Sequence, residues 1–273
     1  MASFDSARNC YVVRVVYDGP GFAGKTTNLQ HICKVIPATR RSEMYTPAEL
    51  RGRTMFFDWL ELEGPSQGDV ALKFHLITVP GQIERNYRRR PLVAMADVLV
   101  FVCDSSPKQI PDTLRTFARL RASMKRRESP VPLVVQANKQ DVEGSLPPHQ
   151  LRKKLNVDTG VPMVTASAST GRGVKETLTT AIRLGVQTLR DSQAEPLLEA
   201  FANADNLFDH VLGFEDNPNN DEPVDAEELD VNAQHVELSA EAMAAHLKAQ
   251  PLDALEARAR KAVKRGKSAS SGE

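Results

Sequence analysis

The stretch GPGFAGKTT at residues 19–27 decides the fold of this chain. It follows the apolar run Tyr11–Tyr17 and opens a helical pattern over Lys25–Val35, so it joins a strand to a helix. Its spacing is G-x-x-x-x-G-K-[ST]: the glycines let backbone N–H groups converge on phosphate oxygens, the lysine neutralises their charge, and the hydroxyl can ligate Mg²⁺. The positive end of the helix dipole adds to this attraction. The stretch therefore predicts a phosphate-binding loop.

Outward from this loop, apolar runs of strand type alternate with amphipathic stretches of helix type. The strand-type runs are Tyr11–Tyr17, Thr54–Leu62, Ala71–Val79, Asp97–Cys103, Val131–Ala137 and Val161–Ala166. The helix-type stretches are Lys25–Val35, Arg85–Ala94, Thr113–Arg127, Pro148–Lys154 and Gly173–Leu189. The alternation predicts an α/β fold with a mostly parallel, doubly wound sheet. The turn-rich segment Glu63–Asp69 predicts one antiparallel hairpin at an edge of that sheet.

Composition excludes several classes of protein. The chain has 273 residues, of which 41% are hydrophobic, which is enough for a core and excludes wholesale disorder. It contains no apolar run long enough to cross a membrane, no apolar N-terminal signal segment and no C-terminal cysteine for a prenyl anchor. Three cysteines show no metal-binding spacing, and Cys103 lies in an apolar run as a buried thiol would. We expect a cytoplasmic protein.

The net charge of zero conceals a division of the chain into three parts. Residues 1–190 carry 28 Lys or Arg against 17 Asp or Glu, whereas residues 191–235 carry none against 13. We expect a globular domain over 1–190, a flexible acidic linker over 191–235, and a C-terminal extension over 236–273 with short helices at Ala240–Ala249 and Leu252–Arg265. The acidic segment could contact the basic body of the same chain, or it could serve as a spacer that carries these helices to another protein.

The nucleotide base is indicated by Asn138-Lys139-Gln140-Asp141, which follows the apolar run Val131–Ala137. A carboxylate at Asp141 can accept hydrogen bonds from N1–H and the 2-amino group of guanine, while the stem of Lys139 can lie along the base plane. Adenine lacks both donors and would leave the carboxylate unpaired, which is costly. Backbone N–H groups of Ser167, Ala168 and Ser169 could meet the guanine O6.

In their order, these motifs resemble those of Ras-like small GTPases, and within that superfamily the chain resembles the bacterial MglA family of cell polarity and gliding motility. The resemblance covers about residues 8–190. It rests on the segments GPGFAGKTTNLQ (19–30), RTMFFDWL (53–60), TVPGQ (78–82) and SASTGRGV (167–174). It implies a Ras-like P-loop GTPase domain that hydrolyses GTP slowly with Mg²⁺. A roadblock-domain protein of the MglB type would be its activating partner, and polarity or motility machinery would be its effector. Such partners could recruit it to a cell pole.

The resemblance also assigns roles to residues. Gln82 would place the attacking water, the Gly81 N–H would hold a γ-phosphate oxygen, and Arg53 would stabilise the developing charge. Thr78 stands where most small GTPases have an aspartate, so the metal would depend on Thr26 and Thr54, with Asp58 as a further carboxylate of more structural character. The residues expected to bind GTP are Gly19, Pro20, Gly21, Phe22, Ala23, Gly24, Lys25, Thr26, Thr27, Thr54, Gly81, Asn138, Lys139, Asp141, Ser167, Ala168 and Ser169; Lys25 joins Gln82 and Arg53 as catalytic.

Arginines cluster directly after the TVPGQ segment. At helical spacing Arg85, Arg88 and Arg89 share one face, which is either a solvated surface or a surface offered to an acidic partner. Nucleic acid is disfavoured as the partner because a single aromatic residue, Tyr87, interrupts the basic run.

Three functions remain open from the sequence. The leading hypothesis is a GTP-hydrolysing switch. The second is a scaffold that binds nucleotide but has little or no GTP hydrolysis. The third, an ATP-dependent kinase or ATPase, conflicts with the guanine motif at residues 138–141.

Overall fold

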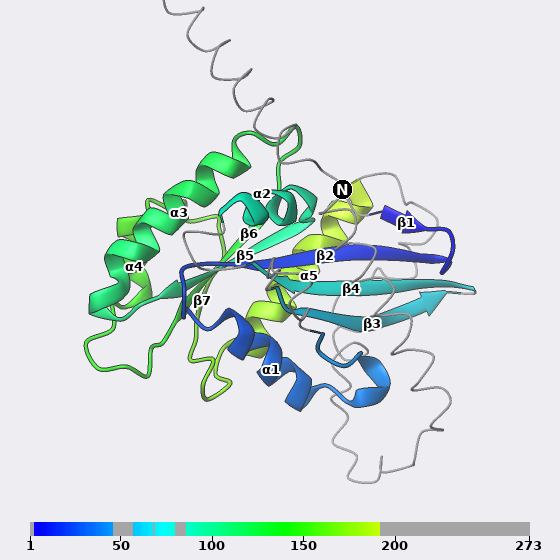
Figure 1. The fold of residues 1–273 in the computed structure, drawn as a ribbon, viewed down its shortest axis with the longest axis horizontal. Helices are drawn as coiled ribbons and strands as arrows, with labels where there is room; N and C mark the ends of the chain where they lie inside the picture. Colours follow the sequence, from blue (N-terminus) through cyan, green and yellow to red (C-terminus); the bar gives the residue numbers. More distant parts are fainter. Residues whose placement is uncertain (1–2, 46–56, 68, 80–85, 192–273) are drawn as a thin grey trace, which may run out of the picture.

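The structure, a computed structural model, describes residues 3–45, 57–67, 69–79 and 86–191 (Figure 1). The expected acidic linker beyond residue 191 and the expected C-terminal helices lie outside these residues. So do four of the expected site residues, Arg53, Thr54, Gly81 and Gln82.

A seven-stranded sheet forms the centre of the described part of the chain. Its strands are β1 (Ser3–Asp5), β2 (Cys10–Asp18), β3 (Trp59–Gln67), β4 (Val70–Thr78), β5 (Val98–Asp104), β6 (Leu133–Asn138) and β7 (Met163–Thr165). The order is β3-β4-β2-β5-β6-β7, parallel from β4 to β7, and β3 pairs antiparallel with β4 at the edge. The predicted mostly parallel sheet with an antiparallel edge hairpin is thus confirmed. Strand β1, which the sequence did not predict, pairs antiparallel with the start of β2.

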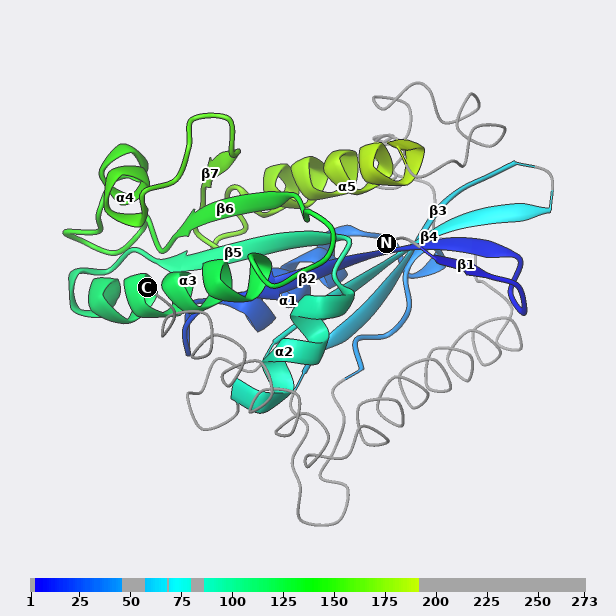
Figure 2. The ribbon, with the colours of Figure 1, turned by 90° about the horizontal axis from the view of Figure 1, so that it is seen from above.

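Helices cover both faces of the sheet (Figures 1 and 2). They are α1 (Lys25–Val35), α2 (Asn86–Met95), α3 (Ile110–Met124), α4 (Pro148–Leu155) and α5 (Val174–Asp191). Apolar side chains of α1 and α5 pack into one hydrophobic core, and those of α2, α3 and α4 pack into the other. Strand β5 supplies both cores and is buried along its whole length, with Cys103 as the expected buried thiol. This burial explains its apolar sequence up to Asp104.

The β3–β4 hairpin differs from its sequence-based description. Strand β3 begins at Trp59 and continues to Gln67, through most of the segment that was expected to be a loop. The pairing register shifts between Glu63 and Ser66, so a bulge absorbs the turn-forming residues within the strand. A Cβ at Gly64 would lie 2.7 Å from the carbonyl oxygen of Leu72, so only glycine fits there. Glycine and proline are tolerated at such bulges on edge strands, which is why they did not end the strand.

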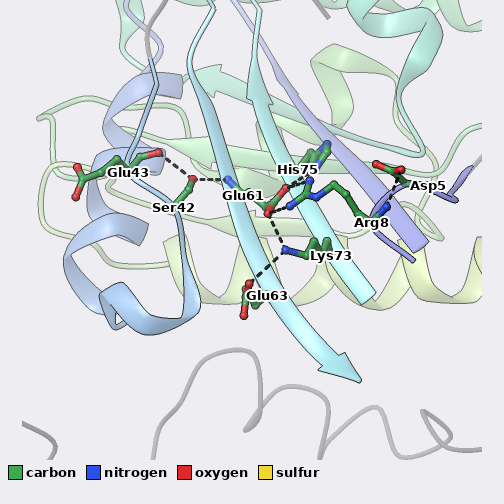
Figure 3. A network of polar contacts seen from close by, with 8 residues as sticks. All are labelled: Asp5, Arg8, Ser42, Glu43, Glu61, Glu63, Lys73 and His75. Carbon is green, nitrogen blue, oxygen red and sulfur yellow. Dashed lines mark hydrogen bonds and ion pairs between the residues drawn. The ribbon is translucent and has the colours of Figure 1, made fainter. Parts of the chain in front are cut away.

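A buried carboxylate ties this hairpin to the turn that follows β1 (Figure 3). Glu61 of β3 accepts hydrogen bonds from both terminal nitrogens of Arg8, at 2.8 and 2.6 Å, and from Lys73 of β4 at 3.0 Å. Its second oxygen lies 2.9 Å from Nε2 of His75. Burial alone would raise the pKa of Glu61, but the hydrogen bonds from His75 and Arg8 hold it well below its ordinary value.

The carboxyl ends of the parallel strands meet at one edge of the sheet. Thr78, Asp18, Asp104, Asn138 and Thr165 are the last residues of β4, β2, β5, β6 and β7. From β2 the chain first builds the sheet on one side, through β4 and β3, and then on the other, through β5. Such a reversal leaves a crevice beyond the strand ends, where α/β sheets bind ligands. None of the described helices combines the length and the apolar composition needed to cross a membrane.

Candidate nucleotide site

The phosphate-binding loop leaves β2 at this reversal point and closes on its own lysine. Lys25 Nζ donates to the carbonyl oxygens of Gly19 at 3.0 Å and Pro20 at 2.7 Å. Burial lowers the pKa of the lysine to about 8, against the opposing charge of Asp18. An ammonium group held only by neutral carbonyl oxygens is stabilised by an incoming anion, because phosphate would replace these partners with a negatively charged one.

Two of the three glycines of the loop are required by close contacts. A Cβ at Gly19 would lie 2.3 Å from the carbonyl oxygen of Val102, and one at Gly24 would lie 2.5 Å from Nδ2 of Asn138. Gly24 also has φ 98°, a conformation that side-chain-bearing residues rarely adopt. Phe22 adopts a positive φ of 61° and exposes its ring to 89%. The loop therefore packs its backbone against β5 and β6 and directs its one aromatic side chain into solvent.

Asn138 joins three of the predicted motifs. Its Nδ2 donates to the carbonyl oxygen of Ala23 in the phosphate loop at 2.7 Å, and its Oδ1 accepts from the backbone N–H of Ala168 at 2.8 Å. The side chain is 1% exposed, so both bonds are shielded from water. One amide thus holds the phosphate loop, the end of β6 and the loop after β7 in fixed positions relative to one another.

Asp141 lies beside these loops with its carboxylate exposed. Ser169 Oγ donates to its Oδ2 at 3.2 Å, and the Ser167 and Ser169 hydroxyls are 3.0 Å apart. The hydrogen bond from Ser167 is the largest cause of a lowered pKa at Asp141. The carboxylate is therefore ionised at neutral pH, which is the state that accepts two N–H donors from guanine.

Lys139 takes a partner that sequence reasoning did not name. Its Nζ donates to Oδ2 of Asp104 at 2.6 Å, and Asp104 is fully buried at the end of β5. The backbone of Lys139 adopts a positive φ of 64°. A carboxylate at the polar end of an otherwise apolar strand was the sequence signal for this contact.

A second set of residues missed by sequence reasoning lies behind the phosphate loop. Asn28 donates to the carbonyl oxygen of Gly24 at 2.8 Å and exchanges two hydrogen bonds with the side chain of Gln136, at 3.0 and 2.8 Å. Gln136 also donates to the hydroxyl of Thr177 in α5 at 2.9 Å. Because all three side chains are fully buried, this network fixes α1 against β6 and α5.

Two hydroxyl groups share a carboxylate where Mg²⁺ is expected. Thr26 Oγ1 donates to Oδ2 of Asp58 at 2.6 Å, and Thr78 Oγ1 donates to the same oxygen at 2.8 Å. The backbone N–H of Asp58 donates in turn to Thr78 Oγ1 at 2.8 Å. Asp58 thus brings a carboxylate from the start of β3 to the end of β4, where the sequence has threonine. The donor set of oxygen atoms fits Mg²⁺: a Thr26 hydroxyl that donates to Asp58 keeps its lone pairs for the metal.

Arg89 corrects the expectation for the arginine cluster. It was grouped with Arg85 and Arg88 on one exposed or partner-binding face, but its side chain is 9% exposed. Its Nε and Nη2 bind Oδ2 of Asp18 at 2.9 and 2.6 Å. The period of a helix groups residues by face and does not reveal a buried carboxylate opposite that face. Arg85 and the side chain of Arg88 lie outside the described part of the chain.

The chain is similar to several known proteins. The Arf: ADP-ribosylation factor family profile matches residues 60–183. The chain is 33% identical to the Mutual gliding-motility protein MglA of Myxococcus xanthus (strain DK1622). The match extends over 185 residues and covers 67% of this chain and 93% of that protein. A solved structure, the Arl6 BBS3 small GTPase of Trypanosoma brucei with bound GppNp, shares 23% identity and a TM-score of 0.46 over 65% of this chain and 99% of that one.

Proposed function

Because the chain belongs to the MglA-like family of small Ras-like GTPases, we propose that it is a switch that binds GTP, hydrolyses it to GDP and signals through the difference between the two states. One observation carries the proposal. The side chain of Asn138 ties the phosphate loop to the guanine-type motif and to the loop after β7, so that all three line one end of the sheet.

We assign nucleotide binding to the residues of this edge. Backbone N–H groups of residues 19–27 and the ammonium of Lys25 would bind the phosphates, as in other loops of this spacing. Asp141 would accept the two donors of guanine, with Ser167, Ala168 and Ser169 beside it. The exposure of Asp141 supports this role, since a carboxylate must be reachable to bind a base.

The metal in this proposal is Mg²⁺. It would supply positive charge to the phosphate oxygens. Thr26 would hold it directly, with Thr54 as a second hydroxyl ligand, and Asp58 would orient the Thr26 hydroxyl through the 2.6 Å hydrogen bond.

For hydrolysis we propose Gln82 to position the attacking water, Gly81 to bind a γ-phosphate oxygen and Arg53 to stabilise the transition state. All three lie outside the described residues, and their support is the motif spacing in the sequence. The retained glutamine and arginine favour hydrolysis over the alternative of a nucleotide-binding scaffold.

By the same family relationship, we propose a roadblock-domain protein of the MglB type as the activating partner. A role in cell polarity or motility follows from the name of the relative, Mutual gliding-motility protein MglA. We further propose that the chain works in the cytoplasm and reaches a cell pole through its partners.

Nucleotide binding and turnover test the function. We expect tight binding of GTP and GDP, weak binding of ATP, and slow release of phosphate from GTP that an activating protein accelerates. ATP binding equal to that of GTP would contradict the assignment of the base. Tight GTP binding without phosphate release, even with an activating protein, would favour the scaffold.

Two substitutions test the catalytic assignment. Gln82→Leu and Arg53→Ala should leave GTP affinity unchanged and suppress turnover, by on the order of a thousandfold for the arginine if it meets the transition state. The measurement is single-turnover hydrolysis with the activating protein present, and Arg90→Ala, at an exposed arginine, is the control. Normal stimulated turnover in Arg53→Ala would remove this residue from the mechanism.

A further inference from the structure

A buried ion pair lies directly beneath the phosphate loop. Asp18 is the last residue of β2, precedes the first glycine of the loop and is fully buried. Its Oδ1 accepts the backbone N–H of Gly19 at 2.6 Å, and its Oδ2 accepts two hydrogen bonds from Arg89 of α2. Arg89 also donates to the carbonyl oxygen of Thr116 in α3 at 3.3 Å, which fixes the guanidinium from a third element.

This carboxylate occupies an unfavourable place for an anion-binding site. The neighbouring loop has to receive negatively charged phosphates, and Asp18 Oδ1 lies 2.6 Å from the backbone nitrogen of Gly19, the residue whose carbonyl oxygen holds Lys25 Nζ. In a poorly solvated interior, a nearby negative charge repels phosphate and attracts the lysine that should bind it.

Arg89 removes both difficulties. Its guanidinium binds Asp18 through two N–H groups, and in the described part of the chain Lys25 is held by the carbonyl oxygens of Gly19 and Pro20 rather than by a carboxylate. The lysine is thus kept from pairing with Asp18 and stays available to an incoming anion.

We propose that Arg89 is a positioning residue for nucleotide binding: it neutralises Asp18 beneath the phosphate loop and so leaves the charge of Lys25 for the phosphates. The inference rests on the proposed nucleotide-binding function and adds a residue of α2 to it. It also makes the affinity for phosphates depend on the placement of α2, the helix that follows the TVPGQ segment.

The test is a double-mutant cycle in the full-length protein, with the dissociation constant of GDP measured in Mg²⁺ buffer. Arg89→Met, which keeps much of the side-chain volume, should weaken GDP binding by on the order of tenfold or more, because the carboxylate is left uncompensated. Asp18→Asn should leave GDP binding equal or tighter. The double variant should recover most of the lost affinity, since no buried negative charge remains.

The rescue separates an electrostatic role from a structural one. If Arg89 only held α2 in place, Asp18→Asn would not repair the defect, and the single Asp18→Asn variant would weaken binding as well. Arg90→Met, one residue along the same helix and exposed, is the matched control and should bind GDP as the wild type does.

Each result bears on the inference. Wild-type GDP affinity in Arg89→Met, or a defect that persists unchanged in the double variant, would overturn it. If Arg89→Met does not fold, a double variant that folds and binds GDP supports it, and one that does not fold overturns it. Failure of the wild-type protein to bind GDP would instead refute the proposed function.

Discussion

At the phosphate end of the site, the carboxylate of Asp58 accepts hydrogen bonds from Thr26 and Thr78 through one oxygen. In the proposed function this arrangement does the work that an aspartate at position 78 would do. A carboxylate that accepts a hydrogen bond from a metal-binding threonine fixes the direction of the lone pairs of the threonine hydroxyl. The hydrogen bond also increases the electron density on the hydroxyl oxygen.

Asp58→Asn tests this arrangement. An amide keeps the size of the side chain but loses the negative charge, so we expect the Mg²⁺ concentration needed for tight nucleotide binding to rise by about tenfold. The measurement is the rate of GDP release as Mg²⁺ is titrated against a chelator. Asp69→Asn, at an exposed aspartate, is the control. An unchanged Mg²⁺ requirement would confine Asp58 to a structural role.

Asp141→Asn tests the choice of base. The amide replaces an acceptor with a donor, so we expect GTP binding to weaken by on the order of a hundredfold and xanthosine triphosphate, which has a carbonyl in place of the 2-amino group, to bind relatively better. Competition binding with the two nucleotides measures the change, with Asp158→Asn at another exposed aspartate as the control. Equal GTP affinity in variant and wild type would contradict the assignment of Asp141 to guanine binding.

At the scale of elements, the β3–β4 hairpin is held by the buried carboxylate of Glu61 and its three partners (Figure 3). The pKa of Glu61 is lowered, so its contribution to stability is complete above the ordinary value of 4.5 and is lost as pH falls toward the folded pKa. Burial lowers the pKa of His75, whose Nδ1 has no hydrogen-bond partner among the described residues, so stability also falls as pH drops below its ordinary 6.5.

We therefore expect wild-type unfolding free energy to decrease from about pH 6.5 downward and more steeply below about 4.5. Glu61→Gln should cost about 2 kcal/mol at pH 7, and the difference from wild type should shrink as pH falls below about 4.5, because the unfolded wild-type carboxylate then takes up a proton while the folded one, with its lowered pKa, stays ionised. Denaturant titrations with excess GDP between pH 3 and 7 measure both curves. Glu63→Gln is the control because the side chain of this glutamate is 44% exposed and pairs with Lys73 at the exposed edge of the network. A pH-independent difference would contradict the pKa argument.

At the scale of the whole molecule, the zero net charge combines a basic body with an acidic segment over residues 191–235. Among the described residues, one core draws on side chains as far along the chain as Leu189 and the other as far as Met163. We propose that the body, residues 1–190, is an independent domain and that the acidic segment contacts its basic surface.

Truncation after Arg190 tests both statements. The shortened chain should keep the midpoint of unfolding and the GDP affinity of the full chain. It should bind an activating protein more tightly than the full chain at low salt, and equally at high salt, because exposed charges are screened beyond about 8 Å at physiological ionic strength. Equal binding at low salt would leave the acidic segment as a spacer.

The phosphate loop, the guanine-type motif, the strand–helix alternation and the edge hairpin were all readable along the chain. Each is encoded by neighbours in sequence: glycines at fixed spacing, apolar runs of strand length, a turn-rich segment. The boundaries of β3 were not readable, because a bulge in a paired strand accommodates glycine and proline that otherwise signal a loop.

The partners of the charged residues became visible in the folded structure alone. Asp58 meets Thr26 and Thr78 across 32 and 20 residues of chain, Lys139 meets Asp104 across 35, and Arg89 meets Asp18 across 71. No local period records such pairings, since they arise when separate strands end at the same edge of a sheet. Burial at that edge then forces each charge to find a partner, and chain order does not specify which partner it finds.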